Sequence, residues 1–258
     1  MDFKNIIFEK EDNIAFIAIN RPEKRNALDP QTWSEIRSAF QICKFDDDVH
    51  VVVITGAGGK AFASGADIQV LRDRQAIEVL RGETQETLNY IENLNKPVIA
   101  AIDGYALGGG CELAMACDLR LATERSRLGL PEVGLGLIPG AGGTQRLQRL
   151  VGFGKAKELI FTAAIIDAHE AERIGLVNKV VPAGELMAAV REMAARIMAN
   201  GPVAVGLAKA AINAGAGTDL NTGLLVERFA QTIAFFTEDK KEGTSAFLEK
   251  RKPVFRGK

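Results

Sequence analysis

Residues 96–114 read KPVIAAIDGYALGGGCELA and lead from an apolar run through a glycine cluster into a helix. Pro97–Ile102 predicts a buried strand, because the apolar run is short and proline occupies its first position, where the lost N–H matters least. Three consecutive glycines then precede a helix that contains Glu112. A strand followed by a helix is the repeating unit of α/β folds with parallel strand pairing.

The same alternation extends toward the N-terminus and a little beyond the glycines. Three further buried-strand candidates are Ile14–Ile19, Val51–Thr55 and Asp118–Ala122. A helix between the first two is capped by Asp29 and has Pro30 at its first position, where proline fits well. Another helix is expected over about 84–94. The first part of the chain is therefore predicted to be an α/β core.

The chain changes character after about residue 142, where helical patterns dominate. Apolar residues recur at helical spacing over 186–197, and further helices are expected over 220–236 and 238–250. We therefore expect two parts, a core over residues 1–195 that carries the active site and a helical region over 196–258.

Composition excludes several classes of protein. The chain has 258 residues, with 32 Lys and Arg against 33 Asp and Glu, so it lacks the basic excess of a nucleic-acid binder. Three cysteines and two histidines supply neither a disulfide framework nor a recognisable metal site. No signal sequence or membrane span is visible, and we expect a cytoplasmic protein without membrane or nucleic-acid partners.

The glycines cluster in three segments, 55–67, 103–112 and 134–144. None is a phosphate-binding motif: both Gly-Lys pairs are followed by alanine, and Pro139 breaks the dinucleotide pattern. Glycines also let backbone N–H groups approach a ligand, so the N–H groups of Ala66 and Gly109 are candidates for a two-donor oxyanion hole. The alternative is that these glycines serve only tight turns and close helix packing.

Two acids stand in apolar surroundings. Glu112 and Glu132 have mostly small or apolar neighbours, which raise a carboxyl pKa toward neutrality and suit general acid–base catalysis. Either acid alone also fits a helix start, where a negative charge is favourable. Together, beside glycine loops, they favour a paired-carboxylate site. Arg21, Lys24 and Arg25 form a basic group that could contact phosphate, but we interpret it as a solvated turn.

These motifs resemble the crotonase (enoyl-CoA hydratase/isomerase) superfamily, and the resemblance covers essentially the whole chain. The segments that carry it are Asn20–Leu28, Ala61–Ile68, Lys96–Gly104, Ala106–Ala114, Gly129–Glu132, Ile138–Arg146 and Glu242–Arg251. The resemblance implies a ClpP-like spiral of ββα turns within the α/β class. It also implies a helical C-terminal trimerisation region, a homo-oligomer (a trimer or a dimer of trimers) and acyl-CoA thioester substrates.

The resemblance also assigns residues to roles. The N–H groups of Ala66 and Gly109 are expected to hold the thioester oxygen. Phe247 and Lys250 are expected to reach the CoA of a neighbouring subunit, and a helix over about 68–81 is expected to shape the acyl pocket. The remaining residues expected to bind substrate are Lys24, Ala27, Ala63, Asp67, Ile68 and Gln69. Many hydratases have a basic residue where this chain has Gln69.

The presence of both glutamates favours a hydro-lyase, an enoyl-CoA hydratase of fatty-acid or related acyl-CoA metabolism. In this hypothesis Glu112 activates water and Glu132 supplies the proton, with no metal and no cofactor beyond the CoA of the substrate. Other superfamily enzymes remain alternatives, such as a Δ3-Δ2-enoyl-CoA isomerase or a dedicated 3-hydroxyacyl-CoA dehydratase. A glycosidase is disfavoured by the few aromatic residues, and an RNA-binding crotonase-fold protein by the net charge of −1.

Overall fold

The computed structural model describes residues 3–258; Met1 and Asp2, the first residues of the segment searched for a signal sequence, lie outside this range. Its larger sheet has the strand order β1-β2-β3-β5-β7-β10. The members are β1 (Ile6–Glu11), β2 (Ile14–Ile19), β3 (Val51–Gly56), β5 (Val98–Ile102), β7 (Leu119–Thr123) and β10 (Lys179–Val181). Only β1 pairs antiparallel in this sheet, with β2.

A smaller sheet of short strands lies beside the larger one, in the order β4-β6-β8-β9. Its members are β4 (Ala61–Ala63), β6 (Tyr105–Leu107), β8 (Arg127–Gly129) and β9 (Ile165–Asp167). The chain passes three times from the larger sheet to the smaller one, from β3 to β4, β5 to β6 and β7 to β8, and each time continues into helices. This is the predicted spiral of ββα turns.

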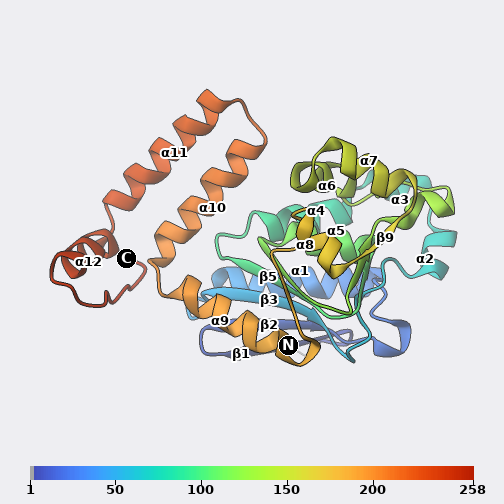
Figure 1. Cartoon of the computed structure of the whole chain (residues 1–258), viewed down its shortest axis with the longest axis horizontal. Coiled ribbons are helices and arrows are strands. Elements are labelled where there is room, and N and C mark those ends of the chain that lie inside the picture. The colour runs from blue at the N-terminus through green and yellow to red at the C-terminus, as the bar shows by residue number, and fades with distance from the viewer. Residues whose placement is uncertain (1–2) are drawn as a thin grey trace.

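Helices α1 to α8 lie in the same part of the chain as these turns (Figure 1). They are α1 (Pro30–Phe45), α2 (Ile68–Asp73), α3 (Ala76–Leu80), α4 (Glu83–Glu92), α5 (Gly109–Ala116), α6 (Gly143–Val151), α7 (Phe153–Phe161) and α8 (Ala168–Arg173). As predicted, the Asp29 carboxylate caps α1 by accepting from the Thr32 N–H at 2.8 Å. Single 3-10 turns are η1 (Pro22–Lys24), η2 (Pro131–Leu135) and η3 (Ala183–Glu185).

The segment after β4 differs from its prediction. One helix over about 68–81 was expected, but α2 and α3 are separate and Arg74 between them is extended. The break is stabilised locally, because the Glu78 carboxylate accepts from the Gln75 N–H at 2.7 Å and so caps a new helix. Neither α2 nor α3 contributes a buried residue.

The core lies on both faces of the larger sheet. In β5, Val98, Ala100 and Ile102 pack with the helices on one face, whereas Ile99 and Ala101 face α9 (Leu186–Met198) on the other. Both faces are covered, and this explains why the strands read as continuous apolar runs. Within residues 3–258, no helix is long and apolar enough to cross a membrane.

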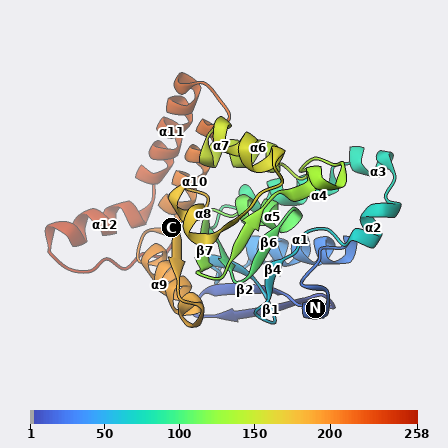
Figure 2. The ribbon, with the colours of Figure 1, turned by 45° about the vertical axis from the view of Figure 1, so that its right-hand side comes forward.

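The last three helices form what we call the C-terminal arm, α10 (Pro202–Ala216), α11 (Leu220–Phe235) and α12 (Glu238–Leu248). Figures 1 and 2 show α10 and α11 as a hairpin that stands away from the sheets. Neither helix of the hairpin contains a buried residue. The predicted boundary at 195/196 falls inside α9, which packs on the sheet up to its end; the division into two parts stays a prediction.

Candidate active site

Helix α5 carries Glu112 into the interior in its first turn. Gly108 precedes the helix with φ 49° and ψ −124°, a backbone conformation that favours glycine. A Cβ at Gly110 would lie 2.1 Å from the Ala63 carbonyl oxygen, so glycine is required for α5 to pack on β4. This close packing leaves Glu112 only 3% exposed.

The buried Glu112 carboxylate is held by a loop from the third glycine cluster. Its Oε1 atom accepts hydrogen bonds from the backbone N–H groups of Ala141 at 2.7 Å and Gly143 at 2.8 Å. Burial raises the pKa of Glu112 above its ordinary value, while these two donors and the nearby Arg146 charge oppose the rise. Glu112 is therefore a buried acid whose anionic form is stabilised by two backbone donors and a nearby positive charge.

Glu132 lies opposite, on η2, directly after Pro131. A Cβ at Gly108 would lie 3.2 Å from Glu132 Oε1, so glycine at that position leaves room for the carboxyl group. Its buried Oε2 atom has no hydrogen-bond partner in the described part of the chain. Burial raises the pKa of Glu132 to about 7, and the Glu112 charge adds to the rise. This acid is poised to exchange a proton near neutral pH.

Both glutamates line one cavity of about 280 Å³, together with Ala66 and Gly109. Its apolar wall includes Trp33, Leu71, Val79, Leu135, Leu137 and Ile138. A small apolar cavity with a few convergent polar groups is typical of a site for a small organic group.

The predicted oxyanion-hole residues are neighbours in space. Ala66 forms a parallel bridge with Leu28, and a Cβ built on Gly109 would lie 4.0 Å from the Ala66 nitrogen. Residues 3–258 also form backbone–backbone hydrogen bonds other than those within helices and strands. Neither the Ala66 N–H nor the Gly109 N–H is a donor in any of them. Both residues line the cavity that contains the two acids. The structure thus brings together all four residues predicted to be catalytic.

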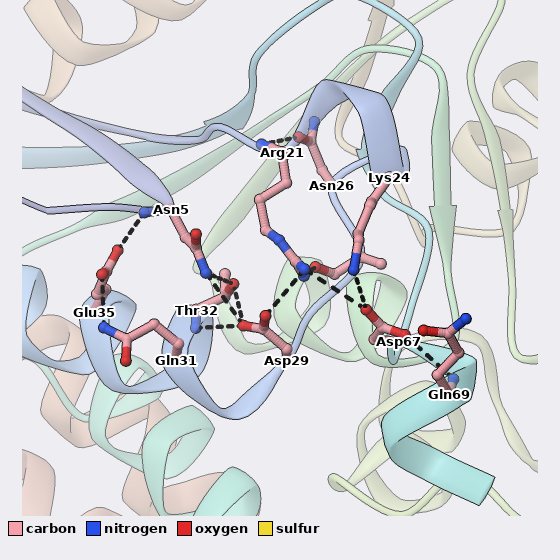
Figure 3. A network of polar contacts seen from close by, with 11 residues as sticks. Asn5, Arg21, Lys24, Asn26, Asp29, Gln31, Thr32, Glu35, Asp67 and Gln69 are labelled. Carbon is pink, nitrogen blue, oxygen red and sulfur yellow. Dashed lines mark hydrogen bonds and ion pairs between the residues drawn. The ribbon is translucent and has the colours of Figure 1, made fainter.

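Several residues predicted to bind substrate meet beside this cavity, around Asp67 (Figure 3). The Lys24 ammonium lies 3.2 Å from the Asp67 carboxylate, which also accepts from the Gln69 N–H at 3.2 Å. Ala27 and Ala63 are buried nearby in the chain, whereas the Ile68 side chain is exposed. Lys24, Asp67 and Gln69 therefore form one polar edge.

The interpretation of Arg21 as part of a solvated turn is wrong. Arg21 is buried, and its guanidinium lies 3.0 Å from the Asp29 carboxylate and 3.6 Å from that of Asp67. It thereby joins the cap of α1 to the polar edge (Figure 3). Its partners are 8 and 46 positions away in the sequence, so a local reading of the turn gave no sign of them.

Phe247 and Lys250 do not join the site within one chain. Phe247 is 83% exposed near the end of α12, and Lys250 follows that helix. Both ribbon views place α12 at the opposite end of the molecule from α2 (Figures 1 and 2). Any contribution of these two residues to this pocket would have to come from another copy of the chain, as the resemblance implies.

Sequence reasoning missed the loop donors Ala141 and Gly143. Their signal was present, since segment 134–144 is glycine-rich, but it was considered only for phosphate binding. A Cβ at Gly143 would lie 2.9 Å from Glu112 Oε1, so this glycine is needed for the close approach. Among the described residues there is no group of three or more His, Cys, Asp or Glu side chains that could hold a metal ion.

Comparison with known proteins agrees with this geometry. The family described as enoyl-CoA hydratase/isomerase matches residues 9–258. The crotonyl-CoA hydratase of Syntrophomonas wolfei is 50% identical and covers 99% of each chain. The short-chain-enoyl-CoA hydratase of Clostridium acetobutylicum is also 50% identical, over 98% of this chain and 97% of that one.

Solved structures show the same likeness. The crystal structure of an enoyl-CoA hydratase from Bacillus anthracis superposes with a TM-score of 0.95 at 43% identity, over 99% of this chain and 100% of that chain. The α/β spiral of ββα turns with a helical C-terminal region is thus confirmed as the crotonase fold. From the family match and the full-length relatives, the chain belongs to the enoyl-CoA hydratase/isomerase family.

Proposed function

We propose that this protein is an enoyl-CoA hydratase that adds water reversibly to a short-chain 2-trans-enoyl-CoA, giving a 3-hydroxyacyl-CoA. The observation that carries the proposal is that Glu112 and Glu132 line one small cavity with Ala66 and Gly109. The names of the two relatives at 50% identity, a crotonyl-CoA hydratase and a short-chain-enoyl-CoA hydratase, support the reaction and the short acyl chain.

The two carboxyl groups divide the proton transfers. Glu112, supported as an anion by two backbone N–H groups, accepts a proton from water as its oxygen bonds to C3. Glu132, with a pKa of about 7, holds a proton near neutral pH and delivers it to C2. The proton on Glu112 then returns to Glu132, which completes the cycle without a redox step.

The N–H groups of Ala66 and Gly109 act on the thioester. As water adds at C3, the C2=C3 electrons shift toward the carbonyl, whose oxygen gains negative charge as an enolate. Two preorganised donors at that oxygen each lower the barrier by on the order of 3 kcal/mol. Proton transfer and charge stabilisation suffice for this reaction, so we propose no cofactor besides the CoA of the substrate.

The polar edge around Asp67 binds the CoA portion. In this proposal Lys24 and Gln69, which both contact Asp67, meet the CoA portion, Ile68 lines the cavity, and Ala27 and Ala63 support this side of the site from the interior. Phe247 and Lys250 of a second copy complete the CoA site in a homo-oligomer, a trimer or a dimer of trimers. Both residues are exposed, and α12, which contains Phe247 and precedes Lys250, lies at the opposite end of the molecule from α2 (Figure 1); these positions support the arrangement.

The test is hydration of crotonyl-CoA, followed by loss of the absorbance of the conjugated thioester. We expect rapid loss with the wild-type protein and the appearance of 3-hydroxybutyryl-CoA by mass spectrometry. A parallel reaction with a β,γ-unsaturated thioester identifies an isomerase. Isomerisation without hydration, or no reaction of crotonyl-CoA, would contradict the proposal.

A further inference from the structure

The loop that holds Glu112 does so through two backbone N–H donors. Helix α6 fixes one of them, the N–H group of Gly143. The Gly142 carbonyl oxygen accepts from the N–H groups of Gln145 at 3.0 Å and Arg146 at 2.8 Å, in the first turn of the helix. The same peptide unit carries the Gly143 N–H that donates to Glu112. Because a peptide unit is planar, the helix start sets the direction of this donor.

The other donor, Ala141, lies outside the helix and is oriented by side chains. Its N–H shares a peptide plane with the Gly140 carbonyl, and the two groups of a trans peptide point in opposite directions. Gln85 on α4 donates from Nε2 to the Gly140 oxygen at 3.0 Å. One end of this peptide is therefore held by Gln85, while the other end contacts Glu112 at 2.7 Å.

A second side chain holds the next peptide unit. Arg146 donates from Nη1 to the Ala141 carbonyl oxygen at 3.0 Å. Its guanidinium is itself anchored on α4, where Nη2 donates to the Glu92 carboxylate at 2.7 Å and to the Asn89 side-chain oxygen at 2.8 Å. The Arg146 side chain is only 10% exposed, and it does not line the cavity.

We propose that Arg146 and Gln85 are positioning residues that clamp the loop from both sides of Ala141, so that its N–H stays directed at the Glu112 carboxylate. This inference rests on the proposed function in taking Glu112 as the base that activates water. Gln85 belongs to α4, and Arg146 of α6 is anchored on α4, so this helix, which supplies no catalytic group, helps to set the geometry of the water-activating acid. The positive charge of Arg146 also favours the anionic form of Glu112.

The main test replaces Arg146 by methionine and compares the variant with Arg149→Met. Arg149 is an exposed arginine of the same helix that donates to Gln145 within α6 and does not contact the loop. For Arg146→Met we expect kcat to fall about tenfold, since a misplaced catalytic group loses alignment, with KM within about twofold. The acid limb of the kcat/KM profile moves to higher pH, because the Glu112 anion loses support. Arg149→Met keeps the wild-type profile.

Two further variants keep the test decisive if Arg146→Met folds poorly. Gln85 is exposed and also lines the cavity, so Gln85→Ala leaves the core intact but changes the cavity wall. We expect a smaller loss of kcat, and the readout of positioning is a pH shift in the same direction as in Arg146→Met. Arg146→Lys, which keeps the charge, restores part of the lost rate. Wild-type kcat and acid limb in a folded Arg146→Met and in Gln85→Ala would overturn the proposal, as would equal changes in Arg149→Met.

The proposed function and this inference fail in different ways. If the wild-type protein does not hydrate crotonyl-CoA, the function is wrong. The positioning role can then still be tested by carbon-13 NMR titration of the Glu112 carboxyl group. Its signal is identified because it is absent from the spectrum of Glu112→Gln. A higher titration midpoint of Glu112 in Arg146→Met than in Arg149→Met supports the clamp, and equal midpoints contradict it.

Discussion

Helices α5 and α11 are both apolar, yet the fold treats them in opposite ways. Seven of the eight residues of α5 are buried, including a glutamate, whereas none of the sixteen residues of α11 is buried. Apolar composition alone therefore does not tell a core helix from an exposed one. Gly110 of α5 allows close contact with the backbone of β4, whereas α11 stands away from both sheets (Figure 1).

This difference in burial suggests different roles for the two helices, catalysis for α5 and assembly for α11. The exposed apolar side chains of α11 include Leu224, Leu225, Phe229 and Ile233. A contiguous apolar surface of this kind marks an interaction site, and the expected homo-oligomer supplies the partner. We therefore expect changes near α5 to alter turnover within one subunit, and changes on α11 to alter oligomeric state first.

The largest expected effect is at α5. Glu112→Gln removes the proposed base, and we expect kcat for crotonyl-CoA hydration to fall by about 10³, with an unchanged elution volume in size-exclusion chromatography. The control is Glu124→Gln, which neutralises an exposed acid in the α/β part of the chain. We expect it to keep wild-type turnover. Near-wild-type kcat in Glu112→Gln would remove this residue from the mechanism.

The next effect is at α11. Phe229→Glu places a charge on the apolar surface, and we expect smaller particles by light scattering. In the proposed CoA site this variant loses Phe247 and Lys250 of the neighbouring copy, so we expect the KM for crotonyl-CoA to rise about tenfold; tenfold corresponds to about 1.4 kcal/mol. The control is Gln231→Glu, which adds the same charge to the same helix without removing an apolar side chain. A wild-type assembly in Phe229→Glu would contradict the role given to the arm.

A third prediction concerns pH. In the proposed mechanism the active free enzyme holds one proton between Glu112 and Glu132, so we expect a bell-shaped dependence of kcat/KM on pH. The upper limb falls through about pH 7, where Glu132 loses its proton. Since hydration exchanges no net proton with solvent, the profile is the same for the reverse dehydration. Initial rates in both directions from pH 5 to 9 check this; an upper limb that persists in Glu132→Gln would exclude Glu132 as its source.

The smallest effect is on stability. The pKa of Glu132 is about 7 in the fold and 4.5 ordinarily, so the native state holds a proton that the unfolded chain releases, and stability falls as pH rises between these values. Glu132→Gln removes this loss. At pH 8 we expect the variant to be more stable by about 1–2 kcal/mol, a figure reduced for solvent screening. Thermal unfolding of both proteins measures this difference in stability. A difference that does not shrink toward pH 4 would show that the ionisation of Glu132 is not its cause.

Four strands of the larger sheet, β2, β3, β5 and β7, were predictable because burial on both faces gives continuous apolar runs, as in Val51–Gly56. The edge strands β1 and β10 of the same sheet were not predicted. The strands of the smaller sheet were not predicted. Ala61–Ala63, Tyr105–Leu107 and Arg127–Gly129 have three residues each, too few to show a period. Their strand character comes from pairing with one another, which is a property of the assembled spiral.

The two glutamates could be found from sequence because an acid among apolar neighbours is unusual. The groups that hold Glu112 were harder to find, since Ala141 and Gly143 act through backbone N–H groups, and the glycine-rich segment 134–144 does not show which side chain they contact. Arg21 shows the same limit for side chains, because Asp67, one of its two ion-pair partners, lies far away in the chain. Long-range contacts therefore account for most of what sequence reasoning missed.

The α2–α3 segment gives the pocket wall an unusual freedom to evolve. Ile68, Leu71 and Val79 line the cavity, yet no residue of either helix belongs to the core. A library of sequences over residues 68–80 would thus change which acyl groups fit while leaving the sheets, the two acids and their loop untouched. In directed evolution, this segment is where a new substrate range is gained with the least loss of foldable variants.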